Sequence, residues 1–330
     1  MAVSAKVFSP KEWKVALISD ATNAGDTGIG STMLQLDVDS IGMPSLNPNQ
    51  VLDVRSGAGR TFKDEDFFQD NVLRVAEISL SGTLHSDAAH KQLLRNITNN
   101  TNTQDGVVDS NHTGTDQRYG AAVTNNCSSL TLVMQPSDVT NQRGLEFFGC
   151  VVTSFSISAD ANTEGGRYKF SATLQTGKKP DLASTAEPTI TPYLNTDIPV
   201  LSNGSGIKVM NKEVVLSTFT TTIEHPAVFS GITTTGYEVV GRGPEIAVTT
   251  EAQVKYDAET KTMINDYDTQ TGANTSNSFV ITNNNAFGVM IHNAVYTNVA
   301  LSEGDMMMLD VAMKAVDDGT DALVTVDVTS

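Results

Sequence analysis

Apolar and polar residues alternate along most of this chain, with the period of two that is typical of half-buried β-strands. The alternating stretches are Ser31–Gly42, Gln50–Gly57, Asn71–Leu84, Ser128–Ser137, Ser217–Gly231, Gly236–Gly243, Pro244–Asp257 and Ser276–Asn285. A slip of the period at Ala76 and Glu77 predicts a β-bulge. The pattern therefore predicts a mainly β protein.

Two segments instead place their apolar residues on one face of a helix. These apolar faces consist of Leu93, Leu94 and Ile97 in the first segment and of Met263, Ile264 and Tyr267 in the second. Ser86 stands at the N-cap position of the first segment, with Asp87 in its first turn, and Asp257 stands at the N-cap of the second. Each segment predicts one amphipathic helix that packs on a sheet.

The strongest interruption of the pattern is Gly177–Gly206, which holds Pro180, Pro188, Pro192 and Pro199. Proline removes backbone donors and favours extended geometry, so this segment predicts a semi-rigid connector. We therefore expect a first lobe over residues 1–179, a proline-rich linker over 180–204 and a second lobe over 205–330.

Both predicted lobes contain strands, one helix, further strands and a closing hairpin in the same order. The hairpins are FFGCVVTSFSISADANTEGGRYKFSATLQTGKK (Phe147–Lys179) and FGVMIHNAVYTNVALSEGDMMMLDVAMKAVDDG (Phe287–Gly319). They share almost no identical residues, yet each opens with an aromatic and a glycine and turns on an acidic, glycine-bearing loop. The common order favours an internal duplication. The sequence thus predicts two tandem β-sandwich or half-barrel lobes, each with one flanking α-helix.

One strand of the second hairpin, Asp305–Met313, is apolar on nearly both faces. Met306, Met308 and Asp310 alternate with Met307, Leu309, Val311 and Met313. We expect this strand to be buried on both sides, by a core and by a neighbouring subunit.

The net charge of −17 and the sequence pI of about 4.5 change the picture of possible partners. Such a surface repels phosphates, which argues against nucleic-acid binding through a basic patch. No apolar run approaches the length that spans a bilayer, and lysines and a proline interrupt the start of the chain where a signal peptide needs apolar residues. We therefore expect a soluble protein made in a cytoplasm.

No catalytic or metal-binding constellation emerges from the sequence. The five histidines show no metal-ligand spacing, and His85 and His90, five residues apart, are expected on different faces of an ordinary polar surface. Cys127 and Cys150 are expected as small core residues, with a disulfide between them left open. We accordingly expect no enzyme, no cofactor and no bound metal.

The closing hairpin and the element order around it resemble the tail tube proteins, or major tail proteins, of long-tailed bacteriophages. The shared features are an aromatic-glycine start, a strand ending in SFSIS, a strand beginning GRYKFS and a GK ending. In this chain they are Phe148-Gly149, Ser154–Ser158, Gly166–Ser171 and Gly177-Lys178. The resemblance rests on pattern and element order and covers the whole chain when both halves are counted.

This resemblance implies that six lobes form a ring whose inner strands make one continuous barrel around a channel. Because this chain carries two lobes, it is similar to fused members in which three chains close a pseudo-sixfold ring. Stacked rings would form the tube through which double-stranded DNA leaves the capsid. The implied partners are further copies of the chain, a tape-measure protein and tail-tip or terminator proteins. The implied location is the virion tail, assembled in the host cytoplasm without membrane insertion by this chain.

Two groups of residues are candidates for these roles. Acids on predicted strands that could line the channel are Asp37, Asp39, Asp53, Glu77, Glu224, Glu238 and Glu251. The segment FKDEDFFQDN mixes aromatics with acids, as a loop that docks on a neighbouring ring would. Its candidates are Phe62, Asp64, Glu65, Asp66, Phe67 and Phe68. The plainer interpretations are solvent-exposed acids and phenylalanines that pack on their own core.

Two other classes of protein remain as alternatives. A two-domain β-sandwich adhesin or surface-binding protein would need an export signal, and the sequence shows none. A carbohydrate-active sandwich would favour clustered aromatics for stacking on sugars, yet the chain has a single tryptophan, Trp13.

Overall fold

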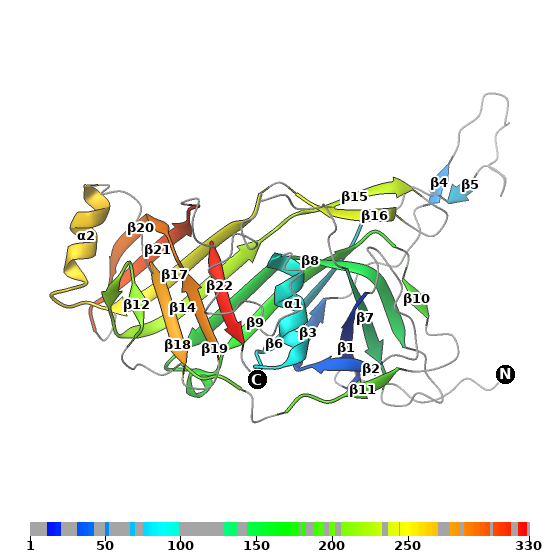
Figure 1. Cartoon of the computed structure of the whole chain (residues 1–330), viewed down its shortest axis with the longest axis horizontal. Helices are drawn as coiled ribbons and strands as arrows, with labels where there is room; N and C mark the ends of the chain where they lie inside the picture. Colours follow the sequence, from blue (N-terminus) through cyan, green and yellow to red (C-terminus); the bar gives the residue numbers. More distant parts are fainter. Residues whose placement is uncertain are drawn as a thin grey trace.

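The structure is a computed structural model, and its elements carry the labels of Figure 1. It describes residues 12–20, 32–42, 50–52, 67–69, 75–98, 129–136, 144–178, 180–182, 188–194, 198–201, 206–232, 237–243, 245–269, 278–283, 287–303, 306–317 and 323–328. In these residues the protein is mainly β with two α-helices, which confirms the predicted fold class.

Four strands from each half of the chain join in one antiparallel sheet, the shared sheet, in the order β3-β6-β9-β8-β14-β17-β21-β20. Their bounds are β3 Val38–Gly42, β6 Ala76–Thr83, β8 Leu145–Asp160, β9 Lys169–Thr176, β14 Leu216–Glu224, β17 Ala247–Lys255, β20 Ala294–Ser302 and β21 Met308–Ala315. The halves meet where β8 pairs with β14, from Asp160↔Thr218 to Ser154↔Glu224. Figure 1 shows the first-half strands on the right and the second-half strands on the left.

The order of strands within the shared sheet repeats. In each half the sheet begins with the earliest of its four strands, continues with the second and the fourth, and ends with the third. A helix follows the second strand in both halves: α1 (Ala88–Thr98) after β6, and α2 (Lys261–Asp268) after β17. The two halves therefore repeat a topology, as well as a sequence pattern.

Each half adds a second layer of strands. In the first half the order is β11-β2-β1-β7-β8, with β10 also on β8; in the second half it is β13-β12-β18-β19-β22. The bounds are β1 Lys14–Ser19, β2 Thr32–Leu36, β7 Leu130–Gln135, β10 Asp181–Leu182, β11 Thr189–Thr191, β12 Lys208–Val209, β13 Lys212–Glu213, β18 Phe279–Asn283, β19 Phe287–Ile291 and β22 Val324–Val328. A short 3-10 turn, Glu164–Gly166, connects β8 to β9.

The closing hairpins of the two halves differ in how their strands are divided between the shared sheet and the second layer. In the first half the 16-residue strand β8 pairs first with β7 and then with β9 and β14. In the second half the chain breaks at His292 and Asn293, so β19 belongs to the second layer and β20 to the shared sheet. One long strand therefore serves both layers in the first hairpin, whereas two separate strands do so in the second.

One hydrophobic core runs through both halves. The buried ring of Tyr168 lies 5.6 Å from that of Phe219 and 5.2 Å from that of Phe287, measured between centroids. A first-half tyrosine thus packs between two second-half phenylalanines. Both the sheet and the core therefore combine residues from the two sides of the predicted linker. The placing of domain boundaries at 180–204 stays a prediction.

Parts of the predicted linker are built into the first half. Strand β10 pairs with the start of β8, β11 runs parallel to β2, and Val200 forms an isolated bridge with Arg167. Backbone hydrogen bonds hold this segment, in addition to the stiffness that its prolines provide.

Three local predictions need correction. The N-cap of α1 is Asp87 and not Ser86, because the Asp87 carboxylate accepts a hydrogen bond from the backbone N–H of His90 at 2.9 Å. Asp257 makes the same contact with Thr260 N–H, at 3.0 Å, but caps the turn that precedes α2. The predicted bulge at Ala76 is absent, since β6 and β9 pair without a shift. An irregularity occurs instead in β3, between Val38 and Ser40, opposite the far end of β6.

Each half also carries a hairpin between the first and second strands of its part of the shared sheet. The bounds are β4 Gln50–Leu52 and β5 Phe67–Gln69 in the first half, and β15 Ala227–Ile232 and β16 Tyr237–Arg242 in the second. Figure 1 shows β15 and β16 reaching along the molecule over first-half strands, and β15 contacts β8.

Gly82 lets the backbone at the start of β3 lie close against β6, which generates a stability prediction. A Cβ atom at this position would overlap the carbonyl oxygen of Asp37 and lie 2.8 Å from Val38 Cα. We expect Gly82→Ala to lower the free energy of unfolding by about 1–3 kcal/mol, because backbone atoms must move. Chemical denaturation measures this, with Ser81→Ala as the matched control; equal stability of the two variants would contradict the close approach.

Candidate functional site: a polar sheet face and two open edges

One face of the shared sheet is lined with hydroxyl side chains. Ser81, Ser171, Ser156, Thr222, Thr249 and Lys314 follow one another across six strands, each paired with the next. All six are exposed or half-buried, whereas the residues between them along each strand point into the core. The row crosses the β8–β14 joint without interruption, so both halves share one polar surface.

Charged side chains on this face are mostly acidic. In the described part of the face they are Asp39, Glu77, Asp160, Glu224, Glu251 and Asp310, with Lys169, Lys255 and Lys314 as the cations. Four of these acids, Asp39, Glu77, Glu224 and Glu251, are among the predicted channel acids. The structure thus brings together, on one surface, residues that are far apart in the sequence.

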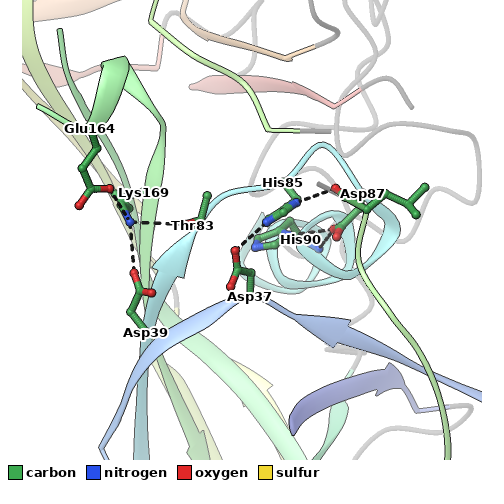
Figure 2. A network of polar contacts seen from close by, with 9 residues as sticks. Asp37, Asp39, Thr83, His85, Asp87, His90, Glu164 and Lys169 are labelled. Atoms are coloured by element: carbon green, nitrogen blue, oxygen red, sulfur yellow. Dashed lines mark hydrogen bonds and ion pairs between the residues drawn. The ribbon is translucent and has the colours of Figure 1, made fainter. Parts of the chain in front are cut away.

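Lys169 stands at the β3 end of this face between two carboxylates. Its ammonium nitrogen lies 2.9 Å from Glu164 Oε2 and 3.2 Å from Asp39 Oδ2, as Figure 2 shows. Partial burial lowers the pKa of Lys169, but the bonds and charges of Glu164 and Asp39 outweigh it and raise the pKa above its ordinary value. The cation therefore cancels part of the negative charge at this corner.

The remaining candidates lie elsewhere. Asp37 does not belong to the open face, because its Oδ2 atom lies 3.0 Å from Nε2 of the buried His85. Glu238 lies in the hairpin strand β16, and its side chain is outside the described residues. Asp53 also falls outside them.

The predicted docking segment is tested only in small part. Phe62, Asp64, Glu65 and Asp66 lie outside the described residues. The backbones of Phe67 and Phe68 form β5 against β4, but their side chains are not described. The docking role of this segment stays a prediction.

The shared sheet ends in two strands with one partner each. Among the described residues, β3 pairs only with β6, and β20 pairs only with β21. Such an edge presents a row of backbone N–H and C=O groups that can pair with another strand. The polar face and these two edges are the candidate functional surface.

A clamp that sequence analysis missed fixes the second half on the first. Arg242, at the end of β16, donates hydrogen bonds to Val152 O at 2.5 Å, His225 O at 2.9 Å and Asn96 Oδ1 at 2.8 Å, and also to Asn96 O. His225 donates from its backbone to Thr153 O at 2.9 Å, and its ring Nδ1 lies 2.7 Å from Ile97 O. The clamp satisfies carbonyls in the last turn of α1, where cations are favoured.

The burial of His85 and His90 contradicts the prediction of a polar surface, and His225 is buried as well. His85, His90 and His225 are fully buried, and the rings of His85 and His90 stack with their centroids 5.8 Å apart. A spacing of five residues would place two side chains on different faces of a helix. His85, however, precedes α1, and only His90 lies within it. No periodicity could have revealed this arrangement.

In the described residues no group of three or more His, Cys, Asp and Glu could hold a metal ion, and no helix could cross a membrane. Cys150 is a buried free thiol, as predicted for a core residue, and burial raises its pKa, while Cys127 lies outside the description. A comparison with protein-family models and with curated proteins finds no match to this chain.

His225 makes the clamp sensitive to pH. Burial, and then the charge of Arg242, lower the pKa of His225 from 6.5 to about 4. The folded state therefore favours the neutral ring, and this contribution to stability is complete above pH 6.5 and lost as the pH falls toward 4. We expect Tm to fall over this window by on the order of a few degrees more in the wild type than in His225→Gln.

Thermal unfolding at half-unit pH steps measures the difference, because all other titrating groups are common to both proteins. Parallel Tm curves between pH 6.5 and pH 4 would contradict a neutral buried His225.

Proposed function

We propose that this protein is a structural subunit that assembles into rings and, by stacking of rings, into a tube of the phage-tail type. The observation that carries the proposal is the repeated strand order of the shared sheet, joined head to tail by β8 and β14. The chain therefore already contains one joint between two equivalent units.

The free edges are the counterparts of the two strands that make this joint. β20 ends the second unit as β8 ends the first, and β3 begins the first unit as β14 begins the second. If β20 of one copy pairs with β3 of the next, the sheet continues with the same antiparallel geometry. Contacts of this head-to-tail kind close into a ring when the rotation fits, and closure removes the exposed edges.

The polar face is the one that we assign to the channel. The opposite face is covered by the core, the second-layer strands and α1, so only the hydroxyl-lined face can border water inside a closed barrel. Its excess of carboxylates would repel a DNA backbone and keep it from adhering during passage. Three chains with two units each would give the pseudo-sixfold ring that the resemblance implies.

The role is structural and not enzymatic, with no cofactor. Copies of the same chain are the principal partners; a tape-measure protein, tail-tip or terminator proteins and passing double-stranded DNA follow from the resemblance. The location would be the virion tail, after assembly in the host cytoplasm.

The first test is the size of the purified protein. We expect light scattering to give the mass of three chains and negative-stain electron microscopy to show rings or tubes with apparent sixfold symmetry. A monomer at every concentration, with no rings on the grid, would count against self-assembly by this chain.

A second test addresses the edges directly, in a background with Cys127→Ser and Cys150→Ala. Ser40→Cys on β3 is combined in turn with Asn298→Cys, Ala300→Cys and Ser302→Cys, which lie on the same face of β20. Because Cβ atoms of paired residues are about 4.5–5.5 Å apart, we expect one combination to give a covalent ladder of chains on oxidation. Ser40→Cys with Thr249→Cys, in mid-sheet, is the matched control; equal ladders from it would argue against the edge joint.

A further inference from the structure

We propose that an apolar contact closes the joint between copies: Leu194 of one copy packs against Leu301, Met306 and Met307 of the next. This inference rests on the proposed head-to-tail ring and names the side chains that hold it together. Its occupant is therefore a second copy of this chain.

These four side chains are unusually open to solvent. Met306 is 64% exposed, Leu194 61%, Met307 51% and Leu301 49%. A cluster of large apolar side chains exposed to water is typical of a surface that a partner covers. Three of the four, Leu301, Met306 and Met307, lie at the end of β20 and in the turn to β21, directly beside a free edge of the shared sheet.

The joint between β8 and β14 shows what a turn in the corresponding position contacts. In the first half, the corresponding turn after β8 donates from Ala161 N to Ser217 O at 2.8 Å and from Asn162 Nδ2 to Ser217 Oγ at 3.3 Å. Ser217 comes directly before Thr218, where the ladder between β8 and β14 begins. A turn at the end of one unit thus meets the first residues of the leading strand of the next unit.

Leu194 lies where an incoming turn would arrive. Asp37 directly precedes β3, and the buried ring of His85 connects the two places: Nε2 lies 3.0 Å from Asp37 Oδ2 and Nδ1 lies 3.1 Å from Leu194 O. Figure 2 shows the contact between His85 and Asp37, with His90 beside the His85 ring. The neighbouring Tyr193 packs on His85 with ring centroids 4.8 Å apart.

The backbone at Leu194 is therefore held while its side chain is exposed. Burial, and next the charge of Asp37, raise the pKa of Tyr193, which agrees with a position of residues 193–194 beside the start of β3. A side chain fixed in this way loses little freedom when a partner covers it, which favours association.

The turn after β8 is polar, whereas the turn between β20 and β21 carries two methionines, as the proposed contact requires. The first-half turn carries Asn162, Thr163 and Glu164 and meets the polar Ser217 within the chain. The second-half turn carries Met306 and Met307 and, when β20 pairs with β3 of another copy, meets Leu194. Methionine adapts its shape to an apolar surface, so this pair can close the joint without a precise fit in advance.

The test compares Leu194→Ser, Met307→Ser and the double variant with Val228→Ser as the matched control. Val228 is similarly exposed, at 53%, but lies on β15, which is neither of the two edge strands. We expect each of the first two changes to raise the concentration needed for ring formation about tenfold, as loss of one apolar anchor does at an interface. We expect the double variant to assemble about as well as the single variants, without a further tenfold loss. The two changes remove the same contact, so their effects should not add.

Sedimentation velocity over a dilution series measures assembly, and thermal unfolding of the monomer checks that all variants fold equally. If the wild type forms rings and Leu194→Ser assembles like Val228→Ser, the apolar contact is wrong while the ring remains. If the wild type forms neither rings nor an edge cross-link, the proposed function fails, and this contact fails with it.

Discussion

The pairing of β8 with β14 is the interaction on which the rest of this structure depends. It turns two four-stranded units into one sheet, with seven residue pairs from Asp160↔Thr218 to Ser154↔Glu224. It also makes the core continuous, because Tyr168 can then pack between Phe219 and Phe287. Without this ladder each unit would expose an edge strand to water, with the risk of irregular association that such edges carry.

The same pairing decides the character of the two sheet faces. Because the register keeps Ser156 beside Thr222 and Phe155 beside Ile223, hydroxyl residues continue on one face and apolar residues on the other. A slip by one residue would place the second unit's phenylalanine and isoleucine on the open face. The polar surface and the shared core are therefore two consequences of one register.

Buried polar contacts secure this arrangement away from the sheet. Arg242 and His225 bind the carbonyls at the end of α1, and His85 links the connector to the start of β3. Removing one member of such a group leaves its partners buried and unpaired, which costs more than the bond itself contributes. The clamp thus acts beside the β8–β14 joint, and the His85 contact acts beside the edge strand β3.

The sequence by itself determined the local features of this protein. Period-two alternation was sufficient to predict most strands and the mainly β class, and the apolar stripes located both helices to within a few residues, because these signals depend on near neighbours. It also identified Asp39, Glu77, Glu224 and Glu251 as acids on strand faces. Only the tertiary structure decided that these faces are one surface, since that depends on pairing between residues far apart in the chain. The same reason hid the burial of His85 and His225, the break at His292 and the role of Arg242: each depends on contacts that no local pattern encodes.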